Sequence, residues 1–120
     1  MEQSKPRIIK DYEKLDPEIQ EQIKLVYPYG FSHHLISFTN KEGKHVSALP
    51  FETDEKYYLI RMTVREAEIL IEQDDDYDYD GSLKDSVKED YESKYADLDY
   101  LNDQIEDEKE EYPDDTDDDF

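Results

Sequence analysis

The stretch YYLIRMTVREAEILIEQ, residues 57–73, changes from strand periodicity to helix periodicity at a single residue. Before Thr63 the side chains alternate, so that Tyr58, Ile60 and Met62 share one face of an expected strand over 57–63. From Thr63 the order Thr-Val-Arg-Glu matches a capping box, in which the Thr hydroxyl and the Glu66 carboxylate each satisfy a backbone N–H. The stretch predicts a strand that leads directly into a helix.

Two further β-rich runs precede this strand, over residues 35–39 and 44–49. Residues 40–43 between them read as a hairpin turn with Gly43 in a left-handed conformation. The simplest register places Phe38 opposite His45. Together the three runs predict a three-stranded antiparallel meander.

Helices are expected on either side of the meander. Asp16 and Pro17 form a helix start, with the Asp side chain accepting a bond from the first turn, and the helix should stop by Tyr27. Each helix has an apolar stripe, formed by Ile19, Ile23 and Val26 in the first and by Val64, Ala67, Leu70 and Ile71 in the second. The fold class predicted for residues 1–73 is therefore α+β, a small α-β-β-β-α head with both helices on one face of the sheet.

Charge changes abruptly after residue 73. Residues 1–73 hold 13 acidic and 10 basic side chains, whereas residues 74–120 hold 22 acidic side chains and 4 lysines. So much charge, with so few aliphatic groups, predicts that the second part forms no core of its own. We expect an acidic linker over 74–81, an acidic amphipathic helix over 82–111 and a disordered acidic terminus over 112–120.

The helix expected over 82–111 begins at a second box-like start, Ser82-Leu83-Lys84-Asp85. Its carboxylates repel one another, so we expect it to become fully ordered only on contact with a partner. Tyrosines among carboxylates can anchor on a basic partner, or they can simply supply the helix stripe. The candidate partner-binding residues are Tyr91, Tyr95, Leu98, Leu101, Ile105 and Tyr112.

Two patterns in the sequence contain residues that can bind metal ions. Asp76, Asp78 and Asp80, followed by Gly81, resemble the start of an EF-hand calcium loop, but Val87 stands where the bidentate Glu is needed. Calcium binding at this loop is therefore the weaker alternative. The three histidines, His33, His34 and His45, fall too far apart in the expected register to share a zinc ion. We expect no cofactor and no specific metal.

Other classes of protein are disfavoured by what the sequence does not contain. It has no apolar run long enough to span a membrane, no secretory signal at its start and no cysteine, which predicts a cytoplasmic protein without membrane contact. It shows no phosphate loop and no nucleophile-base arrangement, so we expect no enzyme activity.

The leading hypothesis is a regulatory interaction protein whose head docks on a protein, while its acidic tail engages or screens a basic, nucleic-acid-binding surface. Direct binding of nucleic acid is disfavoured by charge repulsion. The alternatives are a tail that only confers solubility, calcium binding, and a phage- or toxin-type nucleic-acid mimic. The layout is similar in architecture to the delta subunit of some bacterial RNA polymerases, without a shared motif, which implies an RNA polymerase as one candidate partner.

Overall fold

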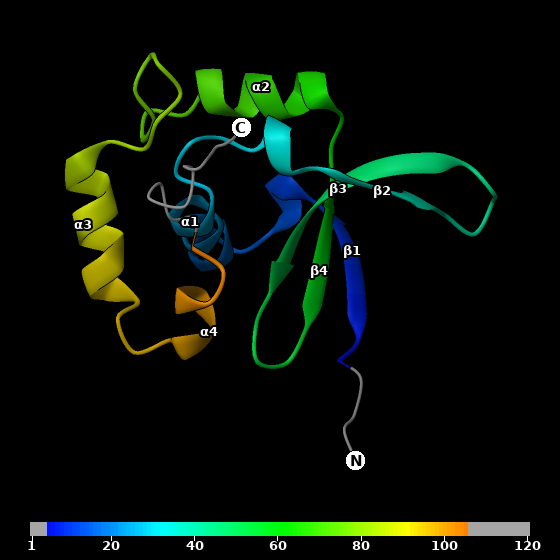
Figure 1. The fold of residues 1–120 in the computed structure, drawn as a ribbon, viewed down its shortest axis with the longest axis horizontal. Coiled ribbons are helices and arrows are strands. Elements are labelled where there is room, and N and C mark those ends of the chain that lie inside the picture. The colour runs from blue at the N-terminus through cyan, green and yellow to red at the C-terminus, as the bar shows by residue number, and fades with distance from the viewer. Residues whose placement is uncertain (1–4, 106–120) are drawn as a thin grey trace, which may run out of the picture.

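A four-stranded mixed sheet forms the centre of the fold in the computed structural model, which describes residues 5–105 (Figure 1). The strands are β1 (Arg7–Asp11), β2 (Ile36–Thr39), β3 (His45–Glu52) and β4 (Tyr57–Arg61), in the spatial order β1-β4-β3-β2. Strands β2, β3 and β4 form the expected antiparallel meander. The α+β class is confirmed, and the sheet has one strand more than expected.

The additional strand, β1, pairs in parallel with β4, from Arg7 opposite Tyr57 to Asp11 opposite Arg61. Its sequence contains only Ile8 and Ile9 between charged residues, and its partner lies about fifty residues away in the chain. Charged side chains are typical of edge strands, where they discourage pairing with other chains. Local patterning therefore did not reveal it.

The register of the meander differs from the expected one by a single residue. Phe38 pairs with Val46 rather than with His45, because the Asn40 side chain accepts bonds from the Glu42 and Lys44 N–H groups and widens the turn. Gly43 is left-handed, as predicted, with φ of 83°. Strand β3 also continues through Pro50. A proline is tolerated there because β2 begins at Ile36, opposite Ala48, which leaves that edge of β3 at Pro50 without a strand partner.

Helices α1 (Pro17–Val26) and α2 (Val64–Glu72) match the two expected in the head. The capping box of α2 is formed, with Thr63 and Glu66 exchanging two bonds of 3.0 Å. Two details were wrong. Asp16 makes no side-chain cap bond, and Val64 is 53% exposed instead of joining the apolar stripe. Two short 3-10 helices complete this part, η1 (Tyr12–Lys14) and η2 (Ser32–His34).

The acidic part does not form the single helix expected over 82–111. Within the described residues it forms α3 (Asp85–Lys94) and α4 (Asp99–Asn102), separated by a turn. Ser82 does not cap α3, because its hydroxyl and N–H both donate to Asp80 while Leu83 enters the core. The remainder of the expected helix, 106–111, and the expected disordered terminus, 112–120, lie outside the described residues.

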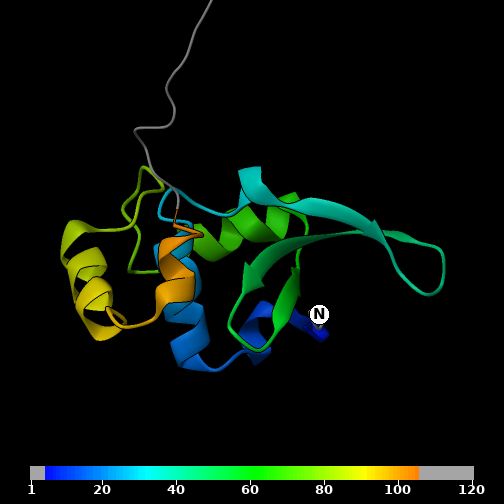
Figure 2. The ribbon, with the colours of Figure 1, turned by 60° about the horizontal axis from the view of Figure 1, so that its bottom comes forward.

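One core cluster contains side chains from both parts of the chain, before and after residue 73. Helix α1 lies between α3 and the sheet in both views (Figures 1 and 2). Buried side chains from the first part include Ile23, Leu49 and Phe51, and those from the acidic part are Tyr77, Leu83, Tyr95 and Leu101. Among residues 5–105 no helix has the length and apolar character needed to cross a membrane.

Candidate functional site

The acidic part is fastened to α1 and to the chain around it by tyrosine hydroxyls. Tyr95 donates to Glu21 Oε1 at 2.6 Å, and Tyr100 donates to Gln22 Oε1 at 2.7 Å. Tyr77 donates to the Tyr27 carbonyl at 2.9 Å, just after α1 ends. Burial, together with the bond to Glu21, raises the pKa of Tyr95 to about 12. These tyrosines face inward and hold the segment in place.

A buried lysine completes the attachment. Lys24 lies in α1, and its Nζ is 2.7 Å from Asp74 Oδ2 and 2.8 Å from Asp76 Oδ2. Tyr91 also donates to Asp76 Oδ2, at 2.7 Å. Burial alone would raise the pKa of Asp76, but the bonds from Lys24 and Tyr91 lower it below its ordinary value. Burial would likewise lower the pKa of Lys24, yet its two carboxylate partners raise it.

The candidate partner-binding residues therefore lie largely inside the molecule. Leu101 is 2% exposed and Tyr95 is buried, while Tyr91, Leu98 and Ile105 are partly buried against the same core. They do come together, as expected of one stripe, but they pack on the body of the protein. Tyr112 lies outside the described residues.

The three aspartates that resemble a calcium loop make different contacts. Asp76 is held by Lys24, and Asp80 accepts from the Ser82 N–H and hydroxyl. Asp78 lines a groove on the surface. Within the described part of the chain no group of three or more His, Asp or Glu side chains is placed to hold a metal ion.

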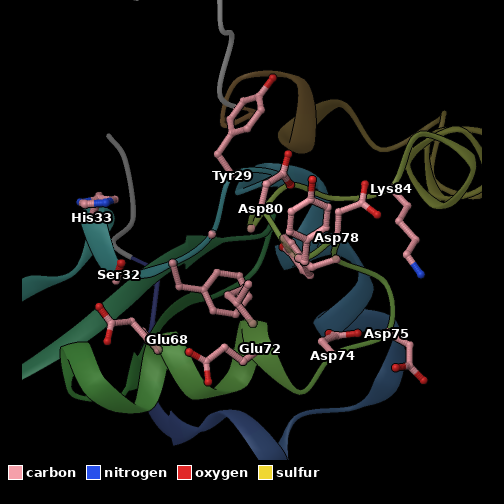
Figure 3. A pocket seen from close by; sticks show the side chains of 17 residues that line it. Tyr29, Ser32, His33, Glu68, Glu72, Asp74, Asp75, Asp78, Asp80 and Lys84 are labelled. Atoms are coloured by element: carbon pink, nitrogen blue, oxygen red, sulfur yellow. The ribbon is translucent and has the colours of Figure 1, made fainter.

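That groove has a volume of about 680 Å³ and lies between α2, the loop before η2 and the loop over 74–84 (Figure 3). Glu68 and Glu72 extend from α2 on one side, and Asp78 and Asp80 extend from the opposite loop. Its wall also includes the buried side chains of Phe31, Ala67 and Tyr77. We call it the acidic groove, and its ionisable lining residues are His33, Glu68, Glu72, Asp74, Asp75, Tyr77, Asp78, Tyr79, Asp80 and Lys84, together with Tyr29.

Two exposed tyrosines border the acidic groove, and neither is among the predicted binding residues. Tyr79 is fully exposed, and Tyr29 is 41% exposed. Tyr79 lies in a closed turn, where the Gly81 N–H donates to the Asp78 carbonyl and Gly81 is left-handed with φ of 88°. The Leu83 N–H then donates to the Pro28 carbonyl at 2.7 Å, which fixes the base of this turn on the body. The Asp-Tyr-Asp-Gly turn signal was present in the sequence and could have indicated an exposed tip.

Comparison of the chain with models of protein families found no match, and comparisons with curated proteins and with solved structures found none either. The function is therefore inferred from the chemistry of the site.

Proposed function

We propose that this chain is a non-enzymatic interaction protein that binds a basic protein surface through its acidic groove and the adjoining carboxylates. The observation that carries the proposal is the sorting of side chains in residues 74–105. Ten of the twelve carboxylates in this segment are exposed, and the other two, Asp74 and Asp76, pair with Lys24. The hydroxyls of Tyr77, Tyr91, Tyr95 and Tyr100 fix the segment, which leaves Tyr79 as its fully exposed tyrosine.

Fixing the segment has a consequence for binding. Carboxylates on an ordered surface lose less conformational freedom on association than carboxylates on a loose chain, so more of their attraction remains as affinity. A strongly negative surface also attracts a basic partner over a Debye length, about 10 Å at 0.1 M salt, and speeds its association. The partner that fits is a protein surface rich in Lys and Arg.

Specificity would come from Tyr79 and Tyr29. An exposed tyrosine beside carboxylates can accept a Lys or Arg side chain against its ring while the carboxylates neutralise the cation. Tyrosine is also enriched among the residues that dominate binding energy at protein interfaces. The acidic groove therefore combines charge for attraction with aromatic surface for selection.

A second candidate is imitation of nucleic acid, since fixed carboxylates can occupy the Lys and Arg grooves that otherwise bind phosphates. In that case the partner is a nucleic-acid-handling protein, of which an RNA polymerase is one candidate by similarity of architecture. The two candidates differ in one outcome. A mimic displaces nucleic acid from the partner's own binding groove, whereas an ordinary acidic ligand binds elsewhere.

The first test uses a Lys- and Arg-rich peptide of defined sequence as the probe, titrated by calorimetry against the full chain at several salt concentrations. Replacing Tyr79 by Ser should weaken binding roughly tenfold, as expected for an aromatic anchor. The matched control is Tyr57→Ser, which removes a tyrosine that does not line the groove. If the two variants bind the peptide equally tightly, only net charge is recognised. The same follows if a peptide of shuffled sequence binds as tightly as the original.

A further inference from the structure

The face of the sheet opposite the core carries a separate apolar surface. The register places Ile9 of β1 beside Leu59 of β4, which is only 2% exposed, and neither residue belongs to the core cluster. Ile9 is 46% exposed, which is unusual for an isoleucine in the middle of a strand. Together with Phe38 from β2 these residues form the apolar part of a hollow of about 400 Å³, which we call the sheet hollow.

Cations surround the sheet hollow. Arg7, Lys41 and Arg61 line it, with Glu42 as the single carboxylate among its lining residues. Arg61 is 3.0 Å from Asp11, and the Arg7 guanidinium lies 5.9 Å from the centre of the Tyr57 ring. In a chain of net charge -21 the lining of this hollow is net positive, with three cations and one carboxylate, and Arg61 is the one of the three that also pairs with Asp11. Its chemistry suits an acidic segment that carries an aromatic side chain.

We propose that the sheet hollow binds residues 106–120 of the same chain. Their sequence, EDEKEEYPDDTDDDF, holds ten carboxylates and one lysine, with Tyr112 and Phe120 as aromatic residues. An acidic segment of another molecule would first have to overcome repulsion from the whole chain. A tethered segment is present at an effective concentration in the millimolar range, so moderate affinity is enough.

The end of the described chain lies within reach of this hollow. The Gln104 side chain donates to the Glu52 carbonyl at 2.6 Å and accepts from the Glu52 N–H at 2.9 Å, which places it beside the end of β3. Glu52 pairs with Tyr57, and Tyr57 pairs with Arg7, so Arg7 is two strands away, about 10 Å at ~4.8 Å per strand. Fifteen residues can span up to about 50 Å when extended, which is ample.

Occupation of the hollow would cover the cationic patch and present an almost uniformly acidic molecule to a partner. This inference does not depend on the proposed function, because it concerns the opposite face of the sheet. It adds an interaction surface whose occupant comes from the chain itself.

Paramagnetic broadening of amide signals tests the proposal in the full chain. The protein contains no cysteine, so Thr116→Cys gives one attachment point for a spin label. Signals from β1, from the β2–β3 hairpin and from β4 around Leu59 should lose intensity, while those of α3 should not. The combined change Ile9→Ser with Lys41→Gln should abolish the loss.

The matched control is Val64→Ser with Lys56→Gln, which removes one exposed apolar side chain and one exposed cation outside the sheet hollow, and it should leave the broadening intact. The proposal is overturned if the hollow signals keep their intensity, if the acidic groove is broadened instead, or if the hollow variant behaves like the control. Binding by a second copy is tested in a mixture of two chains, one isotope-labelled without a spin label and the other spin-labelled at natural isotope abundance. Broadening that appears in the mixture would show that a second copy, and not the same chain, fills the hollow.

Discussion

The part of the chain before residue 74 fills the core with side chains such as Ile23, Leu49 and Phe51, whereas the acidic part contributes two tyrosines and two leucines. The first part buries apolar groups that need no partner. In the second part, buried Tyr77 and Tyr95 each bury a ring and also donate a hydroxyl to the α1 region. A segment with very few aliphatic residues can therefore be ordered if its aromatic residues find both a cavity and an acceptor.

Removal of residues 74–120 should have the largest effect on the fold. Residues 1–73 contain their own capping box and their own change from helix to strand periodicity, which predicts that they fold alone, but the core cluster predicts the opposite outcome. Without Tyr77, Leu83, Tyr95 and Leu101 the side of α1 that contacts α3 and α4 would be open to water, and so small a core has little stability to lose. We expect a collapsed amide spectrum for chain 1–73. A dispersed spectrum that overlays the full chain would mean that the acidic part is an accessory.

A single leucine tests the same dependence on a smaller scale. Leu101 is 2% exposed and packs in the core cluster, so Leu101→Ala should lower the free energy of unfolding by about 2–5 kcal/mol. Urea unfolding followed by circular dichroism measures the change. Val64→Ala, at an exposed position, should change the free energy by less than about 0.5 kcal/mol. Similar values for the two variants would place Leu101 outside the cooperative core.

The Lys24 pair links the two regions electrostatically and should show in the dependence of stability on pH. The pKa of Asp76 is lowered on folding, so its contribution is complete above the unfolded value of ~3.9 and is lost as pH falls through the folded value. The pKa of Lys24 is raised, so its contribution is lost only as pH rises beyond ~10.4.

Lys24→Met should cost roughly 2 kcal/mol near neutral pH, less than the ~3–5 kcal/mol of fully buried pairs because both aspartates are partly exposed. Its loss of stability as pH falls below about 4 should be shallower than that of the unmodified chain. Lys94→Met, which removes a more exposed pair with Glu21, should lower the free energy of unfolding by much less than Lys24→Met. Chemical unfolding across this pH range measures the free energy of unfolding of the three proteins. If it falls equally steeply with pH in all three, the Lys24 pair does not contribute as described.

Local signals in the sequence predicted the first part of the fold well. The Thr63–Glu66 capping box and the left-handed Gly43 are determined by residues within four positions of one another, and both are present. Strand β1 was missed because it depends on β4, and the break between α3 and α4 was missed because periodicity does not reveal where a tyrosine finds an acceptor. The residues from Tyr91 to Ile105 that were expected to bind a partner pack against the core cluster instead, and nothing local showed that α1 would lie against them.

The smallest expected effects come from the tyrosine hydroxyls alone. Tyr95→Phe and Tyr100→Phe keep the rings and remove the bonds to Glu21 and Gln22, so each should cost about 0.5–1.5 kcal/mol. Tyr79→Phe, at a fully exposed position, should leave the free energy of unfolding unchanged in the same urea experiment. If all three variants match the unmodified chain, the rings and not the hydroxyls fasten the acidic part.

Hydrogen exchange in the full chain tests most directly whether the acidic part is built into the fold. The N–H groups of Leu83, Tyr95 and Ile105 donate to the carbonyls of Pro28, Tyr91 and Leu101, so each reports on this region. They should be protected with opening free energies close to those of the central strands β3 and β4, because one core holds both. Exchange of these three at the rate of an unstructured peptide, while β3 and β4 stay protected, would contradict the account.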